Sequence, residues 1–399
     1  MQFLYEHFHG LANLNVWGYI LVSLAFIHVT LLGITLYYHR DQAHRSVELH
    51  PAVRHFFRLW LWINTGANTK EWVAVHRKHH AYCERDGDPH SPALFGLRNI
   101  VLEGAEYYQK EAAKPETLAK YGRGTPDDWL ERNLYNRWPN LGVAVLVVAD
   151  LVLFGVPGII MIAVQLTTMP LLAAGIINGV GHAKGYRNFE TEDASTNLWP
   201  WALFIAGEEL HNNHHAFPSS AKFSQRPWEI DLGWLHLKAL SALRLAKIRR
   251  IAPQPELVAT PKAPDVDALR AVIVNRMHVL RHYTNSVTLP VLRTELDQLG
   301  DNAARLARRA KRLLKWQPGF LDRDSQIHLA ELIERHPGLK TVLAYRSELT
   351  ALWEGANTSN ERLLADFRDW CARAESSGIE VLRDFARYLK SFEALPEPA

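Results

Sequence analysis

The sequence predicts an all-α protein with a membrane-embedded core of about three helical spans, interfacial helices and a separate soluble helical appendage at the C-terminus. Three observations favour this fold class. Two long apolar segments lie in the first half of the chain, all but four of the 20 histidines precede residue 251, and a proline-rich linker introduces a charged tail. We therefore divide the 399 residues into a membrane domain at 1–251, a linker at 252–264 and a cytosolic helical tail at 265–399.

The apolar segments have the lengths that membrane crossing requires. Residues 17–38 contain no Asp, Glu, Lys or Arg, and 22 residues suffice for one crossing. No Lys or Arg precedes Arg40, so the charged start of a signal peptide is missing and we expect the span to be retained. Residues 141–181 carry Asp150 as their only formal charge and are long enough for two crossings that fold back at residues 155–158.

The stretch 51–70 is apolar in part but is interrupted by Arg54, His55, Arg58 and Asn64, which favours an amphipathic helix in the membrane interface. Basic residues flank only the C-terminal side of the first span, beginning at Arg40. By the positive-inside rule, the N-terminus is then outside and the histidine-rich segments and the C-terminus are inside.

The tail holds nearly equal numbers of basic and acidic residues, and prolines and glycines interrupt its helical periodicity. We read it as a helical module joined by the linker. Cys83 and Cys371 cannot form a disulfide framework. The net charge of +3 is too mild to indicate nucleic acid, and we expect no such partner.

Histidines cluster at the predicted inner ends of the spans. On a helix, positions i, i+3 and i+4 share a face, so each of the two H-x-x-H-H motifs can direct three imidazoles to one place. The composition predicts roughly 0.05 such motifs per chain, and two are present, which argues against chance. His39 and His44 are five apart, about 140° around an ideal helix, so we expect the helix to end or distort between them. The candidate ligands are His39, His44, His76, His79, His80, His182, His211, His214 and His215.

Nine imidazoles exceed the four ligands of a structural zinc. They suit two metal ions, with imidazole compatible with Fe, Cu, Zn and Ni. Asn178, which is i, i+4 to His182, would hold a water on one of them. A two-metal site at the membrane surface indicates oxidative chemistry on a lipid, because proton relays and metal transporters place their ligands within the spans.

The motifs HRDQAHR, HRKHH and HNNHHAFP resemble the three histidine boxes of membrane fatty acid desaturases, and GEELHNNHHAFP with NGVGH resembles the stearoyl-CoA (acyl-CoA Δ9) branch. The likeness covers roughly residues 15–245, and the compact form resembles bacterial acyl-CoA desaturases of the inner membrane. It implies that all nine histidines bind a di-iron centre in a cytosolic cap, with Asn178 holding a metal-bound water. It also implies that O2 and two electrons convert a saturated long-chain acyl-CoA into a cis-Δ9 product.

The resemblance suggests several substrate contacts. Trp72 falls where the family has a tryptophan lining the acyl tunnel, although it could instead be an interfacial anchor. Ile27 and Leu31 resemble positions that cap the tunnel, or simply touch lipid. Lys184, Tyr186 and Arg187 could meet the phosphates of coenzyme A, or provide ordinary flanking charge. Asp86 or Asp88 could orient a ligand imidazole.

Electrons would come from a separate ferredoxin, flavoprotein reductase or cytochrome b5-like carrier, because two cysteines cannot hold an iron–sulfur cluster. Two other functions remain open. One is a membrane hydroxylase of alkanes or carotenoids, and the other is a non-enzymatic carrier or sensor of metals. The box context favours desaturation over both.

Overall fold

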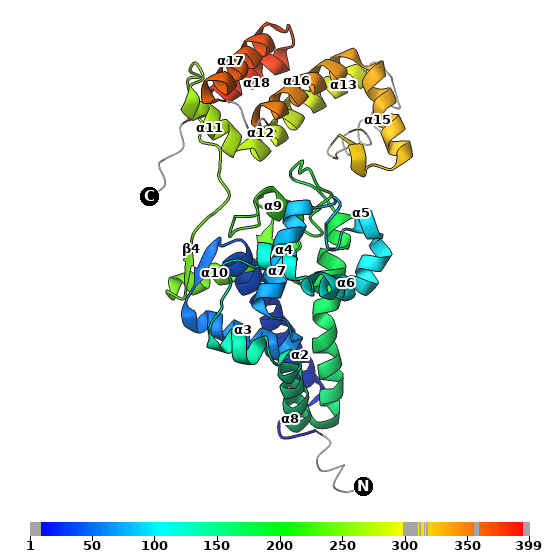
Figure 1. The fold of residues 1–399 in the computed structure, drawn as a ribbon. Helices are drawn as coiled ribbons and strands as arrows, with labels where there is room; N and C mark the ends of the chain where they lie inside the picture. The colour runs from blue at the N-terminus through cyan, green and yellow to red at the C-terminus, as the bar shows by residue number, and fades with distance from the viewer. Residues whose placement is uncertain are drawn as a thin grey trace. The chain divides into compact units, whose positions relative to one another are not determined.

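The computed structural model of the chain describes residues 9–297, 310, 313–314, 316, 318–354 and 359–393. The chain divides into two compact units (Figure 1). The first comprises Met1–Arg187 and Asp193–Ala252, and the second comprises Asn188–Glu192 and Pro253–Ala399. The division predicted at residue 251 did not include Asn188–Glu192 with the tail.

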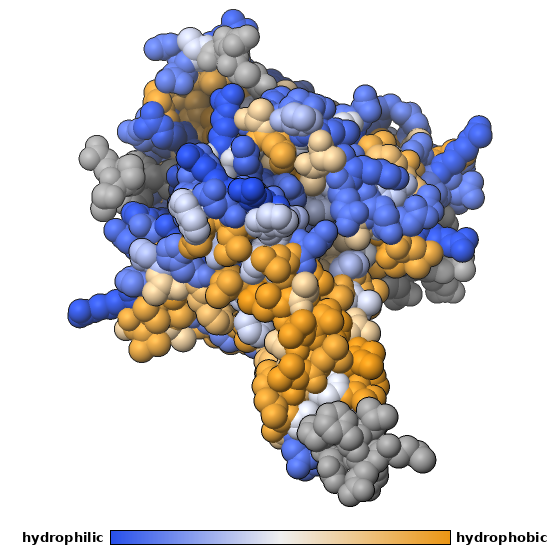
Figure 2. All heavy atoms as spheres, turned by 60° about the horizontal axis from the view of Figure 1, so that its bottom comes forward, coloured by the Kyte–Doolittle hydropathy of each residue, from blue (hydrophilic) through white to orange (hydrophobic). Residues whose placement is uncertain are grey.

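Two segments of the first unit are long and apolar enough to cross a membrane, Val16–Ala43 and Pro139–His182. The first is the α-helix α2 (Val16–Leu32) continued by the π-helix η1 (Gly33–Ala43). The second joins α8 (Pro139–Thr168), the π-helix η3 (Met169–Ile177) and the 3-10 turn η4 (Val180–His182). Figure 2 shows hydrophobic side chains covering the projecting part that α2 and α8 form.

Helix α8 is a hairpin, as its glycines and proline predict. Gly155 has φ 62° and ψ −138°, a conformation that breaks the helix and favours glycine. The Gln165 amide donates a hydrogen bond of 2.5 Å to Asp150 Oδ2. In a straight helix these two residues would be about 22 Å apart. The two arms therefore run antiparallel, and with α2 they give three apolar helical segments, the number that the sequence predicts for the spans.

The N-terminal turn packs on the tip of this hairpin. The backbone N–H groups of Leu11 and Ala12 donate to the carbonyl oxygens of Val152 and Leu153, at 3.0 and 2.8 Å. Helix α2 consequently starts beside the hairpin tip and leads away from it toward His39. The histidines thus lie at the opposite end of the spans from the N-terminus.

Helix α3 (Pro51–Thr65) does not cross the membrane core. Its 15 residues span about 22 Å, less than the hydrocarbon thickness of about 30 Å. It buries Leu61 and Trp62 and exposes Phe56 and Leu59, and the Trp60 indole donates to Thr30 Oγ1 of α2 at 2.9 Å. This amphipathic placement against α2 agrees with the expected interfacial helix.

The remaining elements of the first unit surround the histidines. The helices are α4 (Thr69–Tyr82), α5 (Pro92–Phe95), α6 (Leu97–Ala112), α7 (Pro115–Tyr121), the π-turn η2 (Glu131–Tyr135), α9 (His211–Ala216) and α10 (Leu232–Ala242). Strand β1 (Val47–Leu49) pairs antiparallel with β4 (Ala246–Ile248), and β2 (Trp201–Ala202) pairs parallel with β3 (Ile230–Asp231).

The second unit has its own hydrophobic core, centred on Phe367, Trp370 and Phe385. Its helices are α11 (Val266–Val274), α12 (Arg276–Tyr283), the π-turn η5 (Thr284–Thr288), α13 (Leu289–Asp297), the 3-10 turn η7 (Pro318–Phe320), α15 (Arg323–Arg335), α16 (Pro337–Glu354), α17 (Asn360–Ser376) and α18 (Glu380–Lys390). Glu190 of the Asn188–Glu192 segment accepts hydrogen bonds from Thr284 and Arg346 within this unit.

Candidate metal centre

The π-helix η1 solves the spacing problem posed by His39 and His44. The His44 N–H donates to the His39 carbonyl at 3.0 Å, a bond from residue i+5 to residue i. Residues five apart stack along a π-helix, whereas they would diverge on an α-helix. The expected distortion is therefore present, and it brings the two rings to a centroid separation of 5.0 Å.

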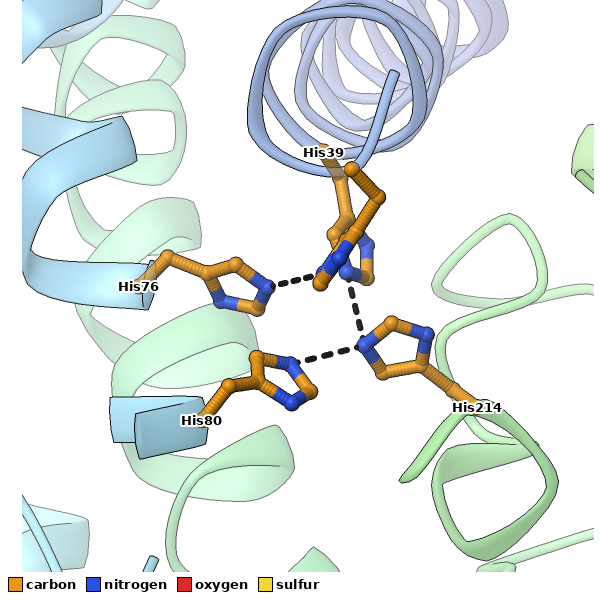
Figure 3. Close-up of side chains that lie close together, drawn as sticks. His39, His76, His80 and His214 are labelled. Carbon is orange, nitrogen blue, oxygen red and sulfur yellow. Dashed lines mark hydrogen bonds between the residues drawn. The ribbon is translucent and has the colours of Figure 1, made fainter. Parts of the chain in front are cut away.

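The first histidine cluster consists of five rings: His39, His44, His76, His80 and His214. Their Nε2 atoms approach closely, at 2.8 Å for His44–His76, 3.0 Å for His39–His214 and 2.9 Å for His80–His214. Figure 3 shows that η1, α4 and α9 each contribute to this meeting point.

The second cluster contains the other four predicted ligands. The Nε2 atoms of His182 and His211 are 2.9 Å apart, and His215 packs against both rings. The His79 ring lies 4.8 Å from that of His182. All nine candidate histidines are thus divided five to four between two adjacent clusters.

The donor sets could hold two metal ions, one among five imidazoles and one among four. Neighbouring nitrogens 2.8–3.0 Å apart are close enough for one metal ion, with bonds of about 2.1 Å, to bind both. In the described part of the chain, the buried His215 Nε2 also has no hydrogen-bond partner, as expected of a ligand atom.

Four carboxylates lie within hydrogen-bond distance of the Nδ1 atoms of four of these histidines, on the side of the ring opposite Nε2. Glu208 lies 2.8 Å from His39, Asp88 3.0 Å from His79, Glu84 2.6 Å from His182 and Asp193 2.8 Å from His215. A carboxylate on Nδ1 fixes the tautomer with the proton there, which leaves Nε2 as a lone-pair donor and increases its basicity. Asp88 therefore plays the orienting role that the sequence left open between it and Asp86, which is exposed.

Burial keeps the remaining rings neutral. Desolvation, reinforced by neighbouring imidazoles, holds the pKa well below the ordinary histidine value at His44, His76, His80, His211 and His214. A neutral imidazole is the form that binds a metal ion.

A cavity of about 320 Å³ lies against both clusters. His39, His76, His211 and Asn178 are among its lining residues. Apolar side chains from α2, η1, α8 and η3 also line it: Leu31, Ile34, Leu166, Met169 and Ile177. The arrangement can hold a hydrocarbon chain with one of its carbons beside the metal-binding rings.

Comparison with known proteins agrees with this geometry. Residues 15–251, more than half of the chain, match the family model described as fatty acid desaturase. The chain is 32% identical over 235 residues to Delta-9 acyl-lipid desaturase 1 of Arabidopsis thaliana, which covers 58% of this chain and 74% of that protein. The chain belongs to the fatty acid desaturase family.

Two further relatives differ in the substrate that their names state. One is the sn-1 stearoyl-lipid 9-desaturase of Synechocystis sp., 30% identical over 240 residues (58% of this chain, 73% of the relative). The other is Acyl-CoA 5-desaturase AL21 of Anemone leveillei, 32% identical over 234 residues (58% and 71%). The desaturase is accordingly an oxidoreductase of lipid metabolism with membrane helices.

The tail of the desaturase gives a different match. Residues 263–395, one third of the chain, match a model described as transposase. The part of this segment that the structure describes is helical and contains no β-strand. The match assigns no activity to the tail.

The desaturase places the predicted substrate residues unevenly. Trp72 lines the cavity and stacks on His76 at 4.9 Å. Among the described residues that line the cavity, Leu31 is present and Ile27 is not, so the shared helical face does not bring both to the wall. Asn178 lines the same cavity as His211, and its water-holding role stays a prediction.

The three residues after His182 differ in exposure. Lys184 is exposed and free to meet a phosphate. The Tyr186 hydroxyl donates to Glu229 at 2.7 Å. Arg187 is buried, and its guanidinium donates to the carbonyl oxygens of Asp193 and Ser195. Arg187 thus holds the loop that carries Asp193, a role that does not fit the expected contact with coenzyme A.

Sequence reasoning missed three of the four orienting carboxylates and the thiol of Cys83. Cys83 Sγ lies 3.7 Å from His79 Nε2, and burial raises the pKa of this thiol well above its ordinary value. Glu208 stands three residues before His211 and Glu84 four residues after His80, so both could have been suspected from their proximity to the boxes. Asp193 lies in a loop that carries no comparable signal.

Proposed function

We propose that this desaturase introduces a cis double bond at carbon nine of a saturated long-chain acyl-CoA, using O2 and two iron ions. The observation that carries the proposal is a cavity lined both by apolar side chains and by rings of the two imidazole clusters. A cavity of this kind excludes water and holds an unactivated methylene group where an oxidant can form.

We propose the nine histidines as the iron ligands. Five would bind one ion through His39, His44, His76, His80 and His214, and four would bind the other through His79, His182, His211 and His215, with a water held by Asn178. Nine imidazoles exceed the four ligands of a structural zinc, and imidazole is a ligand that suits iron.

The reaction has a fixed balance. One O2, two electrons and two protons from outside, and two hydrogens from adjacent CH2 groups give a CH=CH unit and two waters. The irons supply the oxidising power that O2 alone lacks at an unactivated C–H bond. The protein's part is to orient the rings through Glu84, Asp88, Asp193 and Glu208, to dry the cavity and to hold the chain beside Trp72.

The acyl-CoA form and the Δ9 position are supported by relatives. Several relatives are named as Δ9 enzymes, and two others are named as acyl-CoA enzymes that act at position 5. The exposed Lys184, just beyond His182, would be available to a coenzyme A phosphate.

We further propose a bacterial inner-membrane location with the N-terminus outside and the clusters and C-terminus in the cytoplasm. The basic residues that flank only the cluster end of α2 support this orientation. Residues 1–251 would form the desaturase domain, 252–264 the linker and 265–399 the tail. A separate ferredoxin, flavoprotein reductase or cytochrome b5-like protein would deliver the electrons.

Fatty acid analysis of membranes from cells that express the protein tests the function. We expect a new cis-Δ9 acyl chain with the native protein and none with His214→Ala. In membranes supplied with stearoyl-CoA or with stearoyl phosphatidylcholine, rapid conversion of the thioester alone supports the acyl-CoA form. Hydroxylated products, or no product with two irons bound, would contradict the proposal.

A further inference from the structure

Besides the proposed ligand His211, the cavity wall carries three side chains with buried polar atoms that make no hydrogen bond in the described part of the chain. They are Asn64 Oδ1, both ring nitrogens of His90 and the hydroxyl oxygen of Tyr108. Leaving buried polar atoms unpaired costs free energy, and natural proteins retain such atoms mainly where a ligand or water pairs with them. These groups are therefore candidates for contact with the substrate.

The three groups differ in what they can bind. Asn64 donates its amide to the Trp60 carbonyl at 3.0 Å, so its free atom is an acceptor. His90 packs on the ligand His79 with ring centroids 4.6 Å apart, so it belongs to the metal end of the cavity. Of the three, Tyr108 alone offers a hydroxyl that can donate to a carbonyl oxygen. Burial and the nearby Glu71 carboxylate hold the pKa of Tyr108 well above its ordinary value, so the phenol keeps its proton.

Tyr108 shares a cavity with the metal-binding rings. It lies on α6 near the first turn of α4, which contains Glu71. His39, His76 and His211 line the same cavity. A single chain bound there can therefore contact both the Tyr108 hydroxyl and the metal centre.

We propose that the Tyr108 hydroxyl donates a hydrogen bond to the carbonyl oxygen of the bound acyl group and so sets which carbon reaches the metal centre. This inference rests on the proposed desaturation. A carbonyl is common to acyl thioesters and to glycerolipid esters, so Tyr108 serves either source. Relatives of this chain are named as 5-, delta-7 and 9-desaturases, so members of one family differ in where they act along the chain. A residue that holds the carbonyl oxygen at one point in the cavity would determine which carbons of the acyl chain lie beside the metal centre.

The test compares Tyr108→Phe with Tyr107→Phe, a matched loss of one hydroxyl on the same helix. Tyr107 packs on Phe95 at 4.7 Å and is not among the described residues that line the cavity. Membranes from cells expressing each full-length protein are given stearoyl-CoA in one arm and stearoyl phosphatidylcholine vesicles in the other. The apparent KM is measured, and the double-bond position is read by mass spectrometry of dimethyl disulfide adducts.

We expect Tyr108→Phe to bind iron like the native protein, to raise KM by about fivefold and to spread the double bond over positions next to the native one. Tyr107→Phe should match the native protein in all three. The arm in which Tyr108→Phe changes KM identifies the source of the carbonyl. An unchanged KM and a single native product position for Tyr108→Phe in both arms would overturn the inference while leaving the desaturation intact. A native protein that forms no double bond in either arm would overturn both.

Discussion

Replacing Glu208 by glutamine removes the negative charge behind one imidazole and leaves its shape in place. Glu208 Oε1 accepts hydrogen bonds from His39 Nδ1 at 2.8 Å and from Thr35 Oγ1 at 2.5 Å. Burial opposes ionisation of this carboxyl, but the His39 ring and Arg40 outweigh burial and hold the pKa below its ordinary value. The oxygen of a glutamine amide can accept the same two hydrogen bonds, so only the charge is lost.

The size of the effect follows from that difference. A hydrogen bond to a charged group contributes about 1.5–3 kcal/mol, and a neutral one about 0.5–1.5 kcal/mol. Losing the charge therefore costs about 1.4 kcal/mol, which is a tenfold loss of affinity for the metal ion at the first cluster. This value lies at the lower end of the 10–100-fold range typical of residues that orient metal ligands.

The assay is iron binding by the purified protein at a series of buffered free Fe²⁺ concentrations. The iron at the first cluster, about half of the total, should need roughly ten times more free Fe²⁺ to half-saturate its site in Glu208→Gln than in the native protein. Asp86→Asn is the control, because it removes a carboxylate that is exposed on the loop after α4. The reasoning is refuted if the Glu208→Gln titration overlays the native one within twofold.

Three further predictions concern the same centre. His214→Ala removes the ring whose Nε2 lies within 3.0 Å of both His39 and His80, so it should abolish double-bond formation and reduce bound iron while the protein stays in the membrane fraction; an active variant would exclude His214 as a ligand. Leu31→Ala enlarges the cavity and should shift the products toward longer acyl chains, whereas Ile27→Ala should not; gas chromatography of the products checks both. The iron-free protein should lose thermal stability as the pH falls from 7 to 5, because rings whose pKa is depressed by burial bind fewer protons when folded than when unfolded below the ordinary value of 6.5. A melting temperature that rises or stays level over that range would contradict the burial of neutral rings.

Helical periodicity explains how much of the metal centre the sequence could reveal. His76, His79 and His80 share a face of α4, and His211, His214 and His215 share α9, because i, i+3 and i+4 positions coincide on any α-helix. The hairpin was also readable, since Gly155 permits the φ of 62° that reverses the chain. In each case a local rule of backbone geometry fixes the outcome.

The features that could not be predicted depend on contacts between distant segments. Glu84 and His182 are 98 residues apart, and nothing in the local sequence pairs them. Tyr108 is one tyrosine among 13 until the fold leaves its hydroxyl unpartnered on a cavity wall. The sequence shows the charge of Arg187 but not its burial, so we expected a surface cation. In the fold its guanidinium donates to backbone carbonyls of the following loop.

The π-helical conformation of η1 makes the length of this segment as important as its composition. Deleting one residue between Gly33 and His39 would rotate the preceding part of the helix and leave the spacing of His39 and His44 unchanged. Deleting one of the four residues between His39 and His44 would change that spacing from five to four. Such a deletion would let the turn close with ordinary α-helical hydrogen bonds, and the two rings, now four apart, would still share a face. An α-helix that kept the five-residue spacing would instead turn His44 to about 140° from His39 around its axis. We therefore expect homologous chains to combine a five-residue spacing with a π-helix and a four-residue spacing with an α-helix.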